Sequence, residues 1–88
     1  MVVHDQWHIY IVRCRDGTLY TGIAKNVHKR LEEHNSREGG ARYTRSRQPV
    51  KLVYTEPWPS KPEALKRERA IKKLPREKKK QLIKGTIS

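Results

Sequence analysis

The chain has 88 residues, enough for one small domain over residues 1–88, and its single cysteine, Cys14, excludes an intramolecular disulfide framework. No apolar run is long enough to span a membrane, and the first residues lack the regions of a signal peptide, so we expect a soluble protein of a reducing, cytoplasmic compartment. The net charge of +12 attracts polyanions, which makes nucleic acid the first partner to consider. Residues 61–88 carry 11 basic and 3 acidic groups, so the positive charge is concentrated in the last third.

Three segments have the composition of β-strands. Residues 6–14 are rich in Trp, Tyr, Ile and Val on both faces, which predicts a central strand covered on two sides. A turn signal separates this strand from a second one at residues 19–23, and together they predict a hairpin. A third strand is expected from Val50 to Thr55, with Leu52 and Tyr54 on one face, and residues 57–59 should end it.

The hairpin register decides which side chains share a face. A two-residue loop puts Tyr10 and Tyr20 on opposite faces, whereas a three-residue loop with Gly17 in its left-handed position puts them on the same face. The pattern alone leaves both registers open. Gly22, inside the second strand, indicates either a bulge or a close approach of another group to the backbone.

Helix signals follow each part of the predicted sheet. Asn26 can cap a helix that runs to about Asn35, Gly39-Gly40 then breaks the chain, and a short helix or turn is expected over residues 41–47. A capping box at residues 60–63 opens a third helix, and its apolar face is predicted to contain Ala64, Leu65, Ala70, Ile71 and Leu74. Residues 76–84 are expected to form a basic final helix.

The predicted order of elements is β-β-α-α-β-α-α. This order indicates an α+β fold in which helices pack around three strands.

Glu68 is the most informative single position, because it falls in the direction of the apolar face of the third predicted helix. An ionised carboxylate directed toward a core costs several kcal/mol unless it is paired or binds a metal. Two interpretations therefore stay open. Glu68 forms an ion pair with an arginine such as Arg30 or Arg13, or it holds a hard divalent cation.

Other candidates each have a structural and a chemical interpretation. Arg30 and His34 lie one helical turn apart and could bind a phosphate, or they could be ordinary residues of a helix surface. Tyr10, Tyr20 and Tyr43 could be packing aromatics, or they could be reactive phenols whose pKa of about 10 is lowered by the many nearby cations. A zinc site is not expected, because the one cysteine and four histidines have no ligand spacing.

Taken together, the motifs resemble those of the GIY-YIG nuclease superfamily, and most of all its small bacterial UPF0213 group. The resemblance extends from about residue 6 to residue 84. The motifs that carry it, in chain order, are His8-Ile9-Tyr10, Tyr20-Thr21-Gly22, Lys29-Arg30-Leu31-Glu32-Glu33-His34-Asn35, Gly39-Gly40-Ala41-Arg42-Tyr43-Thr44 and Ala64-Leu65-Lys66-Arg67-Glu68.

The resemblance implies a small α/β sandwich with a three-stranded antiparallel sheet and a metal-dependent phosphodiesterase activity. Carried over by position, it makes Tyr10 and Tyr20 a catalytic pair on one face, Arg30 a phosphate contact and His34 an auxiliary group. Glu68 becomes the single protein ligand of one Mg²⁺ or Mn²⁺ ion.

The sequence thus predicts an endonuclease that acts on nucleic acid, with DNA the favoured substrate and Tyr20 the first choice of general base, supported by Tyr10. A protein partner is one source of specificity for so small a domain. A non-catalytic nucleic-acid binder and a basic RNA- or ribosome-associated protein are the alternatives, and the net charge fits all three. We expect contacts to the nucleic acid from Lys25, Lys29, Arg42, Tyr43, Arg45, Lys72, Lys78 and Lys79.

Overall fold

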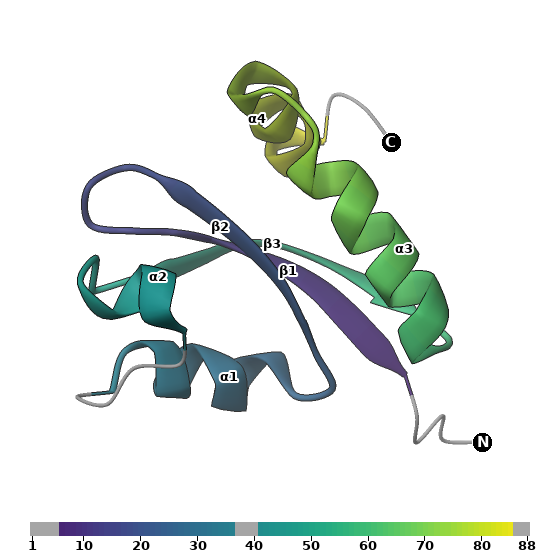
Figure 1. Ribbon diagram of the computed structural model, residues 1–88, viewed down its shortest axis with the longest axis horizontal. Helices are drawn as coiled ribbons and strands as arrows, with labels where there is room; N and C mark the ends of the chain where they lie inside the picture. Colours follow the sequence, from purple (N-terminus) through teal and green to yellow (C-terminus); the bar gives the residue numbers. More distant parts are fainter. Residues whose placement is uncertain (1–5, 37–40, 86–88) are drawn as a thin grey trace.

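A computed structural model describes residues 6–36 and 41–85, and it has the predicted order of elements (Figure 1). The Gly39-Gly40 break lies outside the described residues. The elements are β1 (Trp7–Arg13), β2 (Leu19–Ala24), α1 (Val27–His34), α2 (Arg42–Arg45), β3 (Lys51–Trp58), α3 (Lys61–Lys72) and α4 (Arg76–Lys84). The predicted α+β class with a three-stranded antiparallel sheet is confirmed.

The strands lie in the order β2-β1-β3, so β1 is central as its two apolar faces predict. In the hairpin, Val12 pairs with Tyr20 and the amide of Cys14 donates to the Thr18 carbonyl at 2.8 Å. The loop between them therefore has three residues and ends at Gly17, whose φ of 86° lies in the left-handed region that favours glycine. Of the two registers that the sequence left open, the structure has the one that places Tyr10 and Tyr20 on the same face.

The edge strand β3 differs from its prediction in two ways. It continues through Pro57 to Trp58, because a proline without an N–H is tolerated on an edge strand. Its pairing with β1 also shifts at Ile11/Val12, where one extra residue of β3 is accommodated. This irregularity puts Tyr54 with Val53 against the other face of the sheet, so the prediction that Tyr54 shares a face with Leu52 is wrong.

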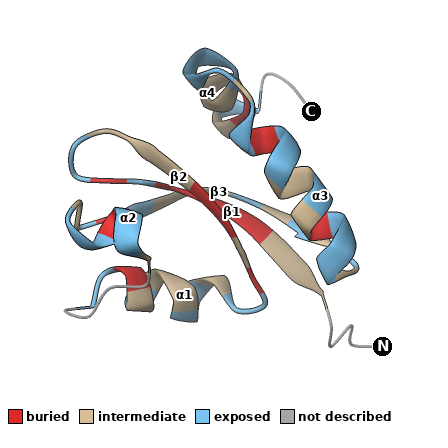
Figure 2. Cartoon of the chain, viewed as in Figure 1, coloured by how far each residue is buried: buried red, intermediate tan, exposed pale blue. Residues whose placement is uncertain are grey.

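Helices cover both faces of the sheet, and buried residues concentrate along β1 between them (Figure 2). On one face, Tyr10 and Val12 pack with partly buried Val27 and Leu31 of α1. On the opposite face, the fully buried Ile9 and Ile11 pack against α3 and α4 through Ile71 and Leu82. The alternating apolar residues of β1 therefore supply both cores.

The helix starts follow their sequence signals. The Asn26 side chain accepts from the Lys29 amide at 3.0 Å, and Ser60 caps α3 by accepting from the Glu63 amide at 3.4 Å. Ala70, however, is exposed instead of belonging to the apolar face of α3. Within the two described ranges, no helix has the length and apolar character needed to cross a membrane.

Candidate active site

The hairpin builds the floor of the candidate site. Tyr10 leans across β2, and its ring lies so close to Gly22 that a Cβ atom there would come within 2.5 Å of the phenol oxygen. Gly22 is thus explained by close approach of a side chain, and the pairing of β1 with β2 is continuous at this point. The missing side chain at Gly22 gives Tyr10 its place beneath α1.

A chain of buried hydrogen bonds connects β1, α1 and α2. The Tyr10 hydroxyl lies 2.7 Å from His34 Nε2, and His34 Nδ1 lies 2.7 Å from Thr44 Oγ1. Thr44 in turn donates to the Ala41 carbonyl at 3.1 Å. His34 and Thr44 are fully buried and Tyr10 is 2% exposed, so water does not compete for these bonds.

These contacts assign the protons. A threonine hydroxyl has one proton, and Thr44 gives it to Ala41, so Thr44 accepts a hydrogen bond from His34 Nδ1–H. Nε2 of a neutral His34 is then an acceptor, and the Tyr10 hydroxyl donates to it. Burial, followed by the positive charge of Arg30, lowers the pKa of His34, which keeps the imidazole neutral.

Arg30 lies on the same face of α1, one turn before His34. Its guanidinium bonds to Glu33 at 3.0 Å, and its side chain is 32% exposed. Burial raises the pKa of Tyr10, and the hydrogen bond and charge of Arg30 oppose that rise without cancelling it. Tyr10 is therefore a neutral phenol in contact with a cation, and Arg30 retains exposed surface for an anion.

Tyr20 is the more accessible of the two hairpin tyrosines, because it is only partly buried. Its ring packs edge-on against His34, with 5.4 Å between the ring centres, and lies 6.5 Å from the ring of Tyr10. On the outer side, Tyr43 of α2 stacks on Tyr20 at 5.8 Å, and the Arg47 guanidinium covers Tyr43 at 4.0 Å. The site thus has an aromatic wall that ends in a cation.

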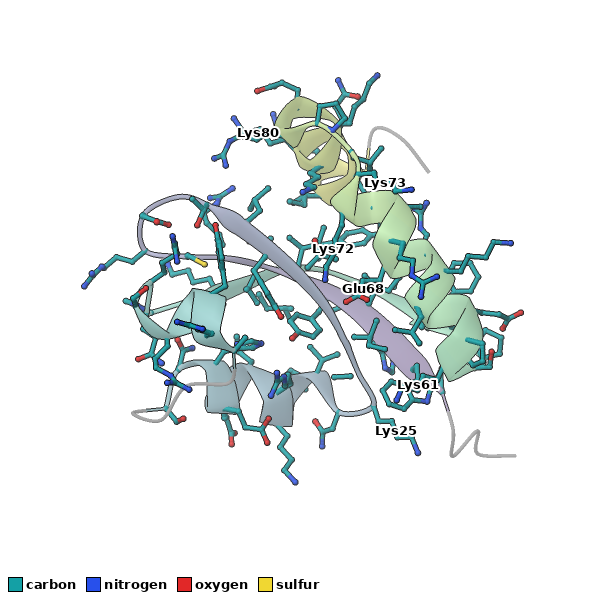
Figure 3. All side chains as sticks on the ribbon, viewed as in Figure 1. Lys25, Lys61, Glu68, Lys72, Lys73 and Lys80 are labelled. Atoms are coloured by element: carbon teal, nitrogen blue, oxygen red, sulfur yellow. The ribbon has the colours of Figure 1, made fainter. Side chains whose placement is uncertain are left out.

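Glu68 reaches the site from α3, and its side chain is 14% exposed. Its ion-pair partner is Lys72, one turn along the same helix, with Nζ at 3.5 Å from Oε2 (Figure 3). The expected ion pair of Glu68 with Arg30 or Arg13 is therefore replaced by one with Lys72. Arg30 bonds to Glu33, and Lys72 is placed beside Glu68 by the i,i+4 spacing of the helix. The same Lys72 ammonium lies 6.0 Å from the centre of the Tyr20 ring.

A second half-buried carboxylate, Glu56 on β3, shows what a saturated structural ion pair looks like in this chain. It accepts from Arg67 at 2.8 Å and from the Trp58 indole at 2.7 Å, and the Tyr54 hydroxyl donates to its other oxygen. Glu68 has no comparable set of neutral donors among the described contacts, and its cationic partner is a half-exposed lysine. Glu68 therefore remains available for exchange of one cation for another.

The donor set at Glu68 fits a hard divalent cation that keeps most of its waters. The described part of the chain contains no cluster of three or more His, Cys, Asp or Glu side chains. Such an ion would therefore have Glu68 as its carboxylate ligand. The carboxylate already accepts a cation, since it holds the Lys72 ammonium. Lys72 can swing outward into solvent when another cation takes its place, because its side chain is 50% exposed.

The structure separates the expected nucleic-acid contacts into groups. Tyr43 and Lys72 adjoin the site through Tyr20, and Arg42 and Arg45 are exposed on α2 around Tyr43. The remaining four lie further from it: Lys29 is exposed on α1, Lys25 follows β2, and Lys78 and Lys79 are on α4, at the opposite end of the molecule from α1 (Figure 1).

Two residues at the site had no role in the sequence-based expectation. Thr44, the partner of His34 Nδ1, belongs to a recognised motif, but a threonine between Tyr43 and Arg45 has no signal of burial. Arg47 also bonds to Asp16 of the hairpin loop at 3.1 Å and so joins the aromatic wall to that loop. Both roles depend on where α2 packs, which is a tertiary property.

Comparison with known proteins gives the family. The model of the GIY-YIG catalytic domain matches residues 6–81, and the chain therefore belongs to the GIY-YIG family, a nuclease superfamily whose members typically depend on a divalent metal. Within it, the chain is 56% identical over 80 residues to the UPF0213 protein DP2720 of Desulfotalea psychrophila, covering 91% of this chain and 73% of that one. It is 54% identical to the UPF0213 protein SSP2268 of Staphylococcus saprophyticus, covering 90% and 95%.

Two solution NMR structures are similar in fold. One is the UPF0213 protein BH0048 of Bacillus halodurans, with a TM-score of 0.58 and 44% identity over 90% of this chain and 83% of that one. The other is the protein EF2693 of E. faecalis, with a TM-score of 0.65 and 40% identity over 93% and 86%. The predicted resemblance to the GIY-YIG superfamily and its UPF0213 group is thus confirmed.

Proposed function

We propose that this protein is a divalent-metal-dependent endonuclease that hydrolyses phosphodiester bonds of nucleic acid, with DNA the favoured substrate. One observation carries the proposal. One face of the sheet brings together Tyr10, Tyr20, Arg30 and His34. The carboxylate of Glu68 comes from the helix layer on the other face, and its partner Lys72 also lies beside the ring of Tyr20. A protein that only binds polyanions gains nothing from a mostly buried carboxylate beside its cations, in a chain whose net charge is +12.

In this proposal, Glu68 holds one Mg²⁺ or Mn²⁺ ion in place of the Lys72 ammonium. When bound, that ion supplies positive charge to the scissile phosphate and to the leaving oxygen. Arg30 binds a non-bridging oxygen of the phosphate and stabilises the negative charge that develops there.

Tyr20 is the proposed general base, because it is partly exposed whereas Tyr10 is buried. In its ionised form, Tyr20 takes a proton from the attacking water, whose oxygen forms the new P–O bond as the leaving oxygen departs in line. Tyr10 and His34 support the base by holding the ring of Tyr20 in its edge-on packing.

The test is a cleavage assay with labelled DNA and RNA of duplex, single-stranded and branched structure, in Mg²⁺, Mn²⁺ or EDTA. We expect metal-dependent cleavage by the wild-type chain and a loss of about 100-fold or more in Glu68→Gln, comparable to removing one group that stabilises transition-state charge. Glu63→Gln is the matched control, since it removes one carboxylate from an exposed position of the same helix and should change the rate by less than about threefold.

Two results would contradict the proposal. One is cleavage that persists in EDTA or in Glu68→Gln at the wild-type rate. The other is tight, salt-sensitive binding of every substrate without cleavage in either metal, which would leave the non-catalytic binder as the better description.

A further inference from the structure

One side of α3 carries charged residues in a line. Lys61, Glu68 and Lys72 are separated by seven and four residues, so at 100° per residue their directions differ by only about 20–40°. Figure 3 shows them on the side of the helix that faces β2, with Glu68 between the two lysines. A cation thus lies on each side of the carboxylate along the seam between α3 and the sheet.

At the beginning of this line, a second lysine joins Lys61. The Lys61 ammonium lies 5.1 Å from the centre of the Trp7 ring, and the Lys25 ammonium lies 5.5 Å from the same centre. Both distances are within the range of a cation–π interaction. Lys25 directly follows β2 and Lys61 is in the first turn of α3, so the fold brings together two cations that are 36 residues apart (Figure 3).

Trp7 restricts where these two flexible side chains go. A free lysine on a surface samples many rotamers, and ordering it costs side-chain entropy. A pair of cations that is positioned in advance at this cost suits a ligand with concentrated negative charge, and a phosphodiester group has it.

We propose that Lys25 and Lys61, held on the ring of Trp7, form a phosphate clamp that binds the backbone of the nucleic acid a short distance from the linkage at Glu68. This inference rests on the proposed function, because it takes the same nucleic acid as ligand. It adds a direction: the bound strand runs along the seam between α3 and β2, from the clamp past Glu68 to Lys72.

The helix sets the spacing between clamp and carboxylate. Seven residues from Lys61 to Glu68 correspond to about 10 Å along the axis of α3. The clamp therefore binds the backbone about 10 Å from the linkage at Glu68. Lys72 lies about 6 Å beyond Glu68 on the other side, one turn further along the helix.

The experiment measures binding of a labelled single-stranded oligonucleotide by fluorescence anisotropy, in EDTA and at several salt concentrations. The test variant is Lys25→Ala/Lys61→Ala. The control variant is Lys51→Ala/Lys84→Ala, which removes the same charge at exposed positions near Arg13, at the end of the sheet opposite Trp7.

Each lost phosphate contact to a single strand lowers the slope of log K against log salt by about 0.7. The test variant should therefore lose about 1.4 from the slope and about 25-fold in affinity at 0.1 M salt, and the control variant less than about threefold. Lys25→Arg/Lys61→Arg should bind as tightly as the wild type, which separates loss of charge from loss of folding.

A local readout comes from the indole N–H signals in a ¹⁵N NMR spectrum. We expect the indole signal of Trp7 to shift on addition of the oligonucleotide, because the two ammonium groups of the clamp lie on its ring. The shift of Trp7 should disappear in Lys25→Ala/Lys61→Ala.

The clamp is refuted if the test and control variants bind alike, if Trp7 does not respond, or if the wild type fails to bind. Failure of the clamp and failure of the nuclease are distinguishable. Metal-dependent cleavage together with an unchanged salt slope in the test variant refutes the clamp alone. Clamp-dependent binding without any cleavage refutes the nuclease and retains the clamp.

Discussion

Replacing Thr44 with valine tests the proton arrangement of the site without any assay of activity. The substitution keeps the shape of the side chain and removes the oxygen that accepts a hydrogen bond from His34 Nδ1 at 2.7 Å. Both residues are fully buried, so water cannot take the place of the lost acceptor. In Thr44→Val, His34 either keeps a buried, unpaired N–H or moves its proton to Nε2, where it competes with the Tyr10 hydroxyl.

The magnitude follows from the burial. A buried polar group left without its partner costs about 1–3 kcal/mol. For a domain of this size, each kcal/mol lowers the melting temperature by about 4–8 °C, so we expect a decrease of about 5–20 °C in Thr44→Val. Thr44→Ser keeps the hydroxyl and should recover most of that loss.

The decisive measurement is the ¹⁵N NMR spectrum of ring-labelled histidine, because a protonated and an unprotonated ring nitrogen have different chemical shifts. We expect the wild type and Thr44→Ser to show His34 with its proton on Nδ1, and Thr44→Val to show a population with the proton on Nε2. The reasoning is refuted if Thr44→Val has the wild-type tautomer and melts within about 1 °C of the wild type.

Two further substitutions test the packing and the charges around the site. Gly22→Ala places a methyl group 2.5 Å from the Tyr10 oxygen, so the ring must move and its hydrogen bond to His34 must break. We expect the free energy of unfolding, measured by urea denaturation, to fall by about 1–3 kcal/mol. A variant as stable as the wild type would contradict the geometry. Burial opposes ionisation of Glu56, but the hydrogen bonds from Arg67 and its neighbours outweigh it and hold the pKa of Glu56 below its usual value. The stabilisation from Glu56 is therefore complete above about pH 4.3 and is lost as the pH falls toward the folded-state pKa. Glu56→Gln should lose less stability than the wild type between pH 7 and pH 3, and an equal loss would refute this source of acid sensitivity.

The elements could be predicted from sequence because their signals are local. Asn26, Ser60 and the apolar residues of β1 each act within a few residues of their own position. The hairpin register could not be fixed in that way, because it depends on the pairing of Val12 with Tyr20 and on the conformation of Gly17. The irregular pairing of β3 was also missed, since Leu52 and Tyr54 alternate like residues of a regular strand.

The candidate site was predictable as a set of residues but not as a network. His34 could have been a surface residue of α1, and its complete burial comes from α2, where Thr44 packs against it ten positions later. The partner of Glu68 was expected to be a distant arginine, and it is a lysine of the same helix. The saturated arginine–carboxylate pair that the sequence allowed at Glu68 is instead formed by Glu56 and Arg67.

The direction of the bond between Tyr10 and His34 has two independent causes. Burial and the charge of Arg30 act together on His34, and both lower its pKa, whereas they act against each other on Tyr10, where burial prevails and raises the pKa. The phenol therefore keeps its proton, and Nε2 of the imidazole has none. The contact of Nδ1 with Thr44 requires the same arrangement, because it places the single ring proton on Nδ1. A buried phenol with its proton directed at a buried imidazole has no free lone pair aimed at solvent for an attacking water. This is why we assign the proposed general base to Tyr20, on the open side of the same cluster, and why Tyr10→Phe should slow cleavage less than Tyr20→Phe.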